Sequence, residues 1–535
     1  MNNYSTEIKN QLDKDEKYRD RLFCRAYMLT DDISINLDIF PFYSQWNVTC
    51  CGKYKLLTHP LLQSFHYSEK NTHIILVGHA YNPFENLIDE NTIIKGLLNA
   101  YSADYYMFLD NLDELTGVFV IFIITGDRII GVQDPGGQRM LYYGKVNENI
   151  VVTSTPQLVE DVFKLSRDKD IITLLSSKGY YRGSGFLPGN KSAYREIKRL
   201  GPNTLIKYIH DSFIIERFFP REQRYELTSE KEKEKESKKL QKLFQINIEL
   251  ILRKWDKVGL SLTGGVDSKT TFANAKPWYN NLFVFSYISK DSERIDAEAA
   301  KSICNHFGVN HHLYEIPDKN EDVEDYELLQ KIIEHNTSYT CKLHQNEKRK
   351  YITLQKKNDF NVEVKSDISE IGRAYTNRKY FRVKMPRKLT PRHLTIGQAR
   401  YFFEPWCMKY ADNAYKDFML QTGLQDDILG YSMHDLVYWE VRMGAWASTS
   451  FASQEYIHEI TIPYNNRKLL EMFLSFPESD RVHDIPHKML IDLGNKDIRG
   501  INASVRDSYF DNKRVIMETI YYYYATVGNR INGKK

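Results

Sequence analysis

Residues 258–269 constrain the fold more than any other part of this chain. They read as an apolar strand, Val258–Leu262, then Thr-Gly-Gly-Val-Asp-Ser over residues 263–268, and then the start of a helix. A glycine turn between a strand and a helix presents backbone N–H groups and the positive end of the helix dipole. The Gly-x4-Gly-Lys-Ser/Thr spacing of the ATPase P-loop is absent. The segment therefore predicts a phosphate or pyrophosphate site of another type, where a strand meets a helix.

The chain around this loop alternates between strand and helix patterns. Leu282–Ile288 reads as the next strand, Asp296–Phe307 as a helix and His311–Ile316 as a further strand. Such alternation favours a parallel sheet covered by helices. After about residue 390 the chain reads as largely helical.

The first 220 residues read differently, as a β-rich region with few helices. Turn residues separate short apolar strands, and we expect these at Ile74–Val77, Val118–Ile124, Ile129–Val132 and Ile150–Thr153, with a closing hairpin of Thr204–Ile209 and Phe213–Ile215. A charge-dense segment, 221–239, follows. We interpret it as a linker running into a helix capped by Ser229 rather than as an interaction tail. The predicted domains are therefore 1–225 and 226–535.

Composition excludes several classes of protein. A 535-residue chain with 42% hydrophobic residues is long enough for two or three domains with real cores. The net charge of +3 argues against a protein dominated by nucleic-acid backbone contacts. The longest apolar run, Val118–Ile124, is too short to span a bilayer, and the polar N-terminus does not resemble a signal peptide. We expect a cytoplasmic protein without membrane or nucleic-acid partners.

The six cysteines offer no familiar metal motif. None forms a C-x-x-C pair, which argues against a structural zinc site, and a disulfide framework does not suit a long chain without a secretory leader.

The loop residues receive specific roles as a nucleotide site. Asp267 is expected to bind the magnesium that neutralises pyrophosphate, and Ser268 to donate to a phosphate oxygen. Ser286, near the end of the next strand, is placed beside the adenine. The competing interpretation is a plain Gly-Gly turn with a capping Ser or Asp. The predicted nucleotide contacts are Ser261, Leu262, Thr263, Gly264, Gly265, Val266, Asp267, Ser268 and Ser286.

These residues resemble the asparagine synthetase and β-lactam synthetase family. The loop is similar to the family's Ser-Gly-Gly-x-Asp-Ser, with Thr263 at the first position, and further similar segments occur in order at 78–82, 115–119, 134–143, 196–202 and 308–312. The resemblance implies an α/β protein. An Ntn-hydrolase-like αββα sandwich would precede an adenine-nucleotide α-hydrolase-like parallel sheet, the PP-loop type of ATP pyrophosphatase. ATP and Mg²⁺ are the implied cofactors.

The chain departs from the family where glutamine hydrolysis would occur. Asn2 stands in place of the family's N-terminal nucleophilic Cys, and Val77 and His79 replace its glutamine-holding Asn and Glu. The first half therefore resembles a glutaminase that has lost its chemistry. Cys24 could serve as the N-terminal nucleophile only if residues 1–23 were removed. The alternative interpretation is that Cys24 is a buried cysteine in a strand.

Two later segments resemble the rest of the family's site. Val362–Arg373 is similar to the second magnesium signature, which assigns Asp367 as a metal ligand and Glu370 as its substitute or a catalytic group. Lys488 falls where the family has a catalytic Lys that neutralises charge in the transition state. A plain turn at 362–373 and a surface lysine at 488 are the alternatives.

The resemblance implies an ATP-dependent, amide-forming ligase. A substrate carboxylate, on a small molecule or peptide, would be adenylated with release of pyrophosphate and then transferred to an amine that does not come from glutamine. Two alternatives remain, a PP-loop enzyme that modifies a nucleobase or tRNA and a non-catalytic scaffold. The sequence leaves open the substrates and whether the protein forms a homodimer.

Overall fold

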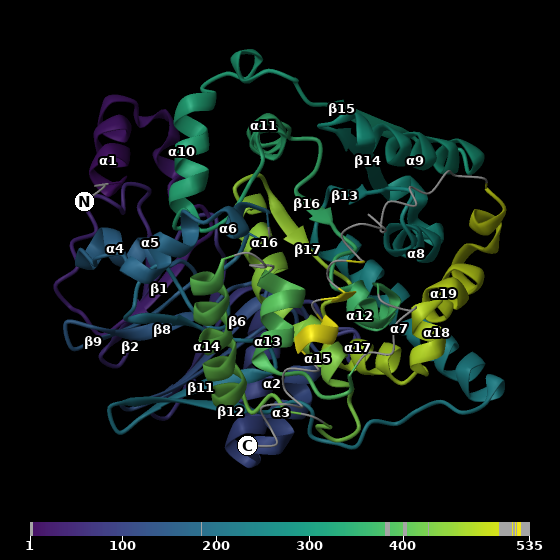
Figure 1. The fold of residues 1–535 in the computed structure, drawn as a ribbon, viewed down its shortest axis with the longest axis horizontal. Coiled ribbons are helices and arrows are strands. Elements are labelled where there is room, and N and C mark those ends of the chain that lie inside the picture. Colours follow the sequence, from purple (N-terminus) through teal and green to yellow (C-terminus); the bar gives the residue numbers. More distant parts are fainter. Residues whose placement is uncertain are drawn as a thin grey trace.

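The computed structural model describes residues 4–182, 185–379, 386–399, 404–425 and 427–501, together with 516, 519–520 and 522–525. The protein has a mixed α/β fold that combines two antiparallel sheets with one parallel sheet (Figure 1). Among the described residues, no helix combines the length and apolar character that crossing a membrane would require.

The first half of the chain forms two stacked antiparallel sheets of six strands each. In the first sheet the spatial order is β10 (Ile197–Arg199), β8 (Tyr142–Val146), β9 (Asn149–Thr153), β1 (Tyr27–Thr30), β3 (Tyr54–Thr58) and β2 (Asn47–Cys51). In the second it is β12 (Ser212–Arg217), β11 (Thr204–Ile209), β7 (Arg128–Gln133), β6 (Thr116–Thr125), β5 (Thr72–Tyr81) and β4 (Ser64–Glu69). Strand β2 is an edge strand of the first sheet, and β4 is an edge strand of the second.

Strand β6 shows why the two sheets become inner layers. Its alternate side chains belong to different cores: Val120, Phe122 and Ile124 pack between the sheets, whereas Phe119 and Ile121 pack under helices. A strand that is apolar on both faces has to be covered on both faces. The outer covers are α2 (Glu90–Ala103) and α3 (Tyr105–Asp113) on one side, and α1 (Tyr4–Lys14), α4 (Pro156–Phe163) and α10 (Tyr326–Asn336) on the other.

Helix α7 (Glu230–Lys254) connects the antiparallel layers to the second half. The Ser229 hydroxyl accepts from the Glu232 N–H, and the Glu232 side chain accepts from the Ser229 N–H, which makes a capping box. Lys233 pairs with Asp480 at 2.6 Å. Residues 230–239 of the charge-dense segment are therefore the start of a long helix, and residues 221–229 lead into it, as the sequence predicted.

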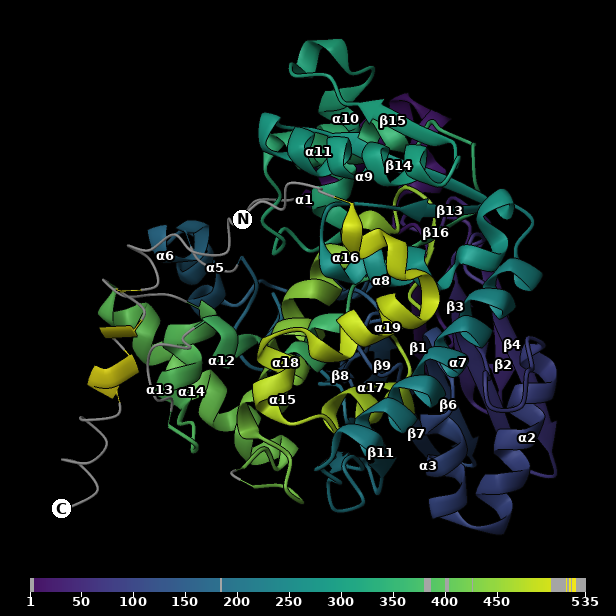
Figure 2. The same cartoon turned by 90° about the vertical axis from the view of Figure 1, so that its right-hand side faces the viewer.

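The second half contains a five-stranded parallel sheet. Its order is β15 (His311–Glu315), β14 (Leu282–Ile288), β13 (Val258–Ser261), β16 (Val362–Val364) and β17 (Glu459–Thr461). One face is covered by α7, α8 (Val266–Asn274), α9 (Arg294–His306) and α19 (Ile485–Asn495), as Figures 1 and 2 show. Strand β13 lies at the centre, so the loop that follows it opens at the middle of the sheet edge.

Two asparagines join the halves. Asn465 donates to the Gly117 carbonyl at 2.6 Å and to Asp134 at 2.7 Å, and Asn466 donates to the Glu114 carbonyl at 2.7 Å. All of these contacts are buried or partly buried, where an unmade hydrogen bond is costly. The segment after β17 therefore fixes the parallel sheet on the end of β6.

The predicted strands agree with the structure in position. The central strand ends at Ser261 rather than Leu262, and the helix predicted at Asp296–Phe307 begins two residues earlier, at Arg294. Strands β1 to β4, β8, β10, β16 (Val362–Val364) and β17 (Glu459–Thr461) were not predicted. Each is at most six residues long, which is too short for a clear apolar pattern.

We predict that Gly117→Ala destabilises the contact between β6 and the segment that follows β17. Gly117 has φ +149°, and a Cβ built on it would lie 2.2 Å from the His79 carbonyl oxygen on the neighbouring strand. The clash is with backbone, so the free energy of unfolding should fall by about 3 kcal/mol or more in urea titrations. Gly96→Ala, within α2 and with open space around it, is the control and should raise stability by about 0.5–1 kcal/mol. Equal stability of Gly117→Ala and the native protein would contradict this account.

Candidate functional site

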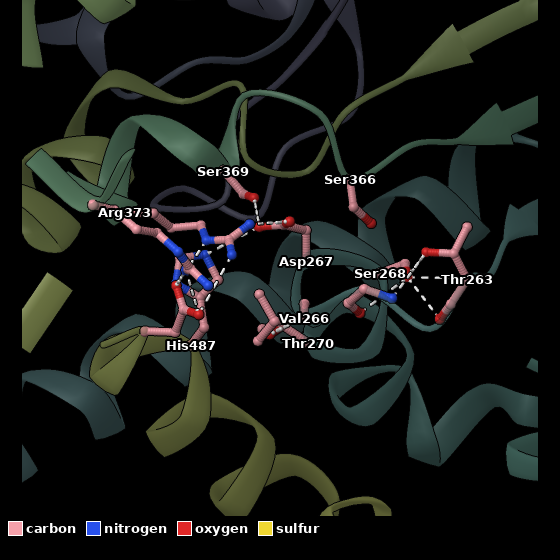
Figure 3. A network of polar contacts seen from close by, with 12 residues as sticks. Thr263, Val266, Asp267, Ser268, Thr270, Ser366, Ser369, Arg373 and His487 are labelled. Carbon is pink, nitrogen blue, oxygen red and sulfur yellow. Dashed lines mark hydrogen bonds and ion pairs between the residues drawn. The ribbon is translucent and has the colours of Figure 1, made fainter. Parts of the chain in front are cut away.

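The loop after β13 is held by its own hydroxyl groups. The Thr263 N–H donates to the Ser268 Oγ at 3.1 Å, the two hydroxyl oxygens lie 2.9 Å apart, and the Gly265 N–H donates to the Thr263 Oγ1 at 3.2 Å. Figure 3 shows the contacts between Thr263 and Ser268 on one side of the first turn of α8. Ser268, predicted to donate to a phosphate, therefore also braces the loop, and Thr263 suits its position because it supplies a hydroxyl.

The two glycines of the loop are not needed for a left-handed backbone. Gly265 has φ −70° and caps the start of α8. A Cβ at Gly265 would lie 3.3 Å from the Thr263 Oγ1, which accepts the hydrogen bond from the Gly265 N–H. Because glycine has no side chain, the N-terminus of α8 stays accessible. A phosphate group could therefore reach its backbone N–H donors.

Asp267 lies in the first turn of α8 and faces a second loop. Its carboxylate accepts from Arg373 at 2.6 Å and from the Ser369 hydroxyl, and Figure 3 shows it between these two side chains. Ser369 and Arg373 are the first and last residues of the 3-10 helix that follows β16. Strands β13 and β16 are parallel neighbours, so their carboxyl ends bring the two loops to one edge. The Thr271 and Ser366 hydroxyls, 2.7 Å apart, tie the loops together again.

A buried charge network continues behind Asp267. The Arg373 Nε donates to Asp484 at 2.8 Å, and Arg378 also pairs with Asp484 at 2.5 Å. Burial alone lowers the pKa of Arg373, but the adjacent Asp267 and Asp484 raise it overall. The site thus has two guanidinium groups beside the predicted phosphate loop, which suits polyanionic ligands.

His487 is a site residue that the sequence did not single out. Its Nε2 lies 3.7 Å from the Asp267 Oδ1, and burial lowers the pKa of the ring to about 4. The imidazole is fully buried and neutral, and neither ring nitrogen has a hydrogen-bond partner among the described residues. Its neighbour Lys488 is the residue that was predicted to act, but the Lys488 ammonium donates to the His483 carbonyl at 2.8 Å.

The second predicted magnesium ligand lies on the β16 loop. Burial, and then the charges of Asp267 and Asp367, raise the pKa of Glu370 to about 8. Desolvation by the surrounding protein also raises the pKa of Asp367, although part of that side chain stays open to solvent. The Glu370 Oε2 is buried without a partner in the described part of the chain. Three mutually repelling carboxyl groups and an unpaired oxygen fit a bound cation.

The three acidic side chains of the site do not surround a single point that one metal ion could occupy. Within the described ranges, the ligand oxygens of Asp267, Asp367 and Glu370 do not all lie within 4.8 Å of one another. Both carboxylate oxygens of Asp267 are taken, one by Ser369 and one by Arg373. A metal ligated by Asp267 would therefore compete with these two contacts.

Ser286 occupies the predicted place at the carboxyl-terminal half of β14. Its hydroxyl donates to the Leu262 carbonyl at 2.7 Å and lies 2.9 Å from the His311 Nε2. Ser286 therefore holds the start of the loop through Leu262, which belongs to the predicted contact set Ser261 to Ser268.

The first half contains Cys24, the cysteine that removal of residues 1–23 would place at an N-terminus. Cys24 is buried within the chain, and Leu22 and Phe23 before it belong to the same core as α1 and α10. His79 lies 2.9 Å from Glu459, beside the start of β17. Asn2, which stands at the position of the family's nucleophile, lies outside the described residues.

Comparisons with known proteins agree with part of this picture. Residues 239–342 match the family model described as asparagine synthase, and this segment contains the loop, β13, β14 and β15. The match covers less than half of the chain and ends before the β16 loop. The β-lactam synthetase subtype stays a prediction. No curated protein matches.

Two of the solved structures that match this chain align with low TM-scores. One is a glutamine phosphoribosylpyrophosphate amidotransferase from B. subtilis complexed with ADP and GMP, with 11% identity over 70% of this chain and 74% of that chain and a TM-score of 0.23. The other is described as the allosteric regulatory enzyme of purine biosynthesis, with 11% identity over 64% of this chain and 89% of that chain and a TM-score of 0.24.

The raised pKa of Glu370 predicts a dependence of stability on pH. In metal-free protein the folded state holds this proton up to about pH 8, whereas the unfolded value is 4.5. Protonated Glu370 therefore favours folding at low pH, and this contribution is lost as pH rises through about 8. Glu370→Gln should become progressively more stable than the native protein between pH 5 and pH 9, measured by urea unfolding with chelator present.

The matched control for Glu370 is Glu298→Gln, an exposed carboxylate on α9. Its difference from the native protein should stay constant over the same pH range. A Glu370→Gln difference that shrinks as pH rises would contradict the assigned environment.

Proposed function

We propose that this protein is an ATP-dependent ligase that joins a carboxylate to an amine. The observation that carries the proposal is the meeting of two loops at one edge of the parallel sheet. One is the glycine loop at the N-terminus of α8, and the other brings Asp367 and Glu370 after β16. The asparagine synthase match over residues 239–342 supports the same class of reaction.

In this proposal the triphosphate of ATP lies against the start of α8. The backbone around Gly264 and Gly265 and the α8 dipole attract the phosphates. Arg373 contacts Asp267 and is linked through Asp484 to Arg378. Asp267 and Asp367 would hold Mg²⁺, which supplies positive charge against the departing pyrophosphate. Arg373 would then exchange its contact with Asp267 for one with phosphate.

The proposed reaction has two steps. An oxygen of the substrate carboxylate attacks the α-phosphorus of ATP, and the bond from that phosphorus to the bridging oxygen breaks, which releases pyrophosphate. An amine then attacks the activated carbonyl carbon and AMP leaves. Glu370 in its deprotonated form would accept the amine proton, and a pKa raised to about 8 by burial and by its acidic neighbours makes it a stronger base than an ordinary carboxylate.

Lys488 keeps its proposed role as a charge stabiliser. Its ammonium has one carbonyl partner at the protein surface, and α19 carries it one residue after His487, which faces Asp267. A rotation of a long lysine side chain would bring the ammonium towards the phosphates. Positive charge aimed at a pyrophosphate stabilises the transition state.

We further propose that the first half is a scaffold without glutaminase activity. Its Cys24 is buried and joined to residues on both sides, so it has no free amine to serve as base. The amine would be free ammonia, a second substrate, or an amine within the same small-molecule or peptide substrate.

The reaction is tested by exchange of labelled pyrophosphate into ATP with a panel of carboxylates. We expect exchange that requires one carboxylate and Mg²⁺. Asp267→Asn should lower the exchange rate by about 100-fold or more, because it removes the charge at the loop. Its circular dichroism spectrum should match the native one.

Asp256→Asn is the matched control for this experiment. Asp256 is exposed just before β13, at the opposite end of the same strand, and its loss should leave exchange unchanged. No exchange with any carboxylate, together with no binding of Mg²⁺ and ATP by calorimetry, would overturn the proposal.

A further inference from the structure

Three metal-ligating side chains meet far from the nucleotide loop, at the open side of the antiparallel sandwich. They are Cys51 on β2, His66 on β4 and His73 on β5. Within the described ranges they form the one group of three or more His, Cys, Asp or Glu side chains whose ligand atoms all lie within 4.8 Å. We name these residues the edge cluster.

The strand registers explain why the two histidines lie together. Strands β4 and β5 are antiparallel, His66 pairs with Ile75, and His73 pairs with Ser68. His66 and His73 are therefore diagonal neighbours on one face of the hairpin. That face is the inner one, because Ile75 belongs to the core between the sheets. The rings stack with centroids 5.3 Å apart.

Cys51 comes to the same point from the other sheet. It is the last residue of β2, pairs with Tyr54 across the β2–β3 turn, and is fully buried in the core between the sheets. Strands β2 and β4 are the edge strands of the two sheets on this side, and Figure 2 shows both beside β3. The edge cluster thus spans the gap between two sheets that share no backbone hydrogen bonds.

The spacing of the ligand atoms matches a tetrahedral metal site. The Cys51 Sγ lies 3.7 Å from the His66 Nε2, and the same His66 Nε2 lies 3.1 Å from the His73 Nδ1. Zinc bonds of about 2.3 Å to sulfur and about 2.0–2.1 Å to nitrogen, at tetrahedral angles, put S and N about 3.6 Å apart and two N atoms about 3.4 Å apart. The three side chains need only small shifts to share one ion.

We propose that Cys51, His66 and His73 bind one Zn²⁺ ion that clips the edge strands of the two sheets together. Sulfur and imidazole ligands in tetrahedral geometry favour zinc over magnesium or calcium. The fourth position faces solvent beside the exposed His66 and takes a water molecule. No motif reveals the site, because the three residues are separated by 15 and 7 positions and converge only through the fold.

The protonation of the ligands is consistent with such a site. Burial, and then His73, lowers the pKa of His66, so its ring is neutral and has a lone pair for the metal near pH 7. Burial raises the pKa of Cys51 to about 12, so metal binding has to release the thiol proton, and the ion then neutralises the buried thiolate. Without metal, the thiol and the stacked rings remain a hydrogen-bonded trio.

A metal ion at this position would stabilise the packing of the two antiparallel sheets. Edge strands expose unpaired backbone groups, and the two edge strands here belong to separate sheets. Metal binding to the folded state alone adds stability in proportion to its affinity. The edge cluster is therefore a stabilising site that does not depend on the proposed ligase reaction.

The proposal is tested by Co²⁺ titration of the full-length protein after treatment with chelator. The Asp267→Asn background removes the carboxylate that is proposed to bind metal at the nucleotide loop. We expect one equivalent of cobalt with a sulfur-to-metal charge-transfer band and tetrahedral visible bands, both displaced by Zn²⁺. Cys51→Ser should abolish the charge-transfer band, and His66→Ala or His73→Ala should weaken binding by more than about 100-fold.

Two controls separate the edge cluster from adventitious binding. Cys50→Ser changes the exposed cysteine next to Cys51, and His210→Ala changes an exposed histidine in the β11–β12 turn, so both should bind as the parent does. Zn²⁺ should raise the melting temperature of the parent but not of Cys51→Ser. A folded parent without the charge-transfer band, or a band that survives Cys51→Ser, would overturn the proposal.

Discussion

The in-register parallel pairing of β13 with β16 is the constraint on which the candidate site depends. Val258 pairs with Val362 and Leu260 with Val364, although about a hundred residues separate them in the chain. Parallel neighbours end at the same edge, so the α8 N-terminus and the β16 loop face each other. Every contact of Asp267 with Ser369 and Arg373 follows from this pairing.

Asp267 and Arg373 hold the two loops in a closed arrangement. Their ion pair is partly buried and extends through Asp484 to Arg378, so removing one member leaves charged partners without compensation. A phosphate ligand would offer the guanidinium groups equivalent oxygens, and a divalent ion would offer Asp267 an equivalent cation. The network therefore acts as a preorganised set of charges whose partners are exchanged on binding.

Local patterns in the sequence predicted the elements around this site well. The apolar run before Gly264, the capping Ser229 and the two-sided apolar β6 each carry their signal within a few neighbouring residues. The residue contacts could not be predicted in the same way. Nothing local shows that Ser268 braces Thr263 instead of facing solvent.

Long-range partners were the least predictable part. Lys488 was predicted because it falls where the resembling family has a catalytic lysine. His487 has no such signal, since only the packing of α19 on α8 brings the histidine to Asp267. The edge cluster was missed for the same reason, since the absence of a C-x-x-C pair was taken to argue against zinc, and ligands on three different strands leave no spacing to recognise.

The central claim, that ATP binds where β13 and β16 end, is tested most directly by amide hydrogen exchange with and without Mg²⁺ and ATP. The account predicts slower exchange in residues 262–274 and 365–373, since ligand contacts and closure protect both loops, and unchanged exchange in β6. Protection absent from both loops, or confined to the antiparallel sheets, would contradict it.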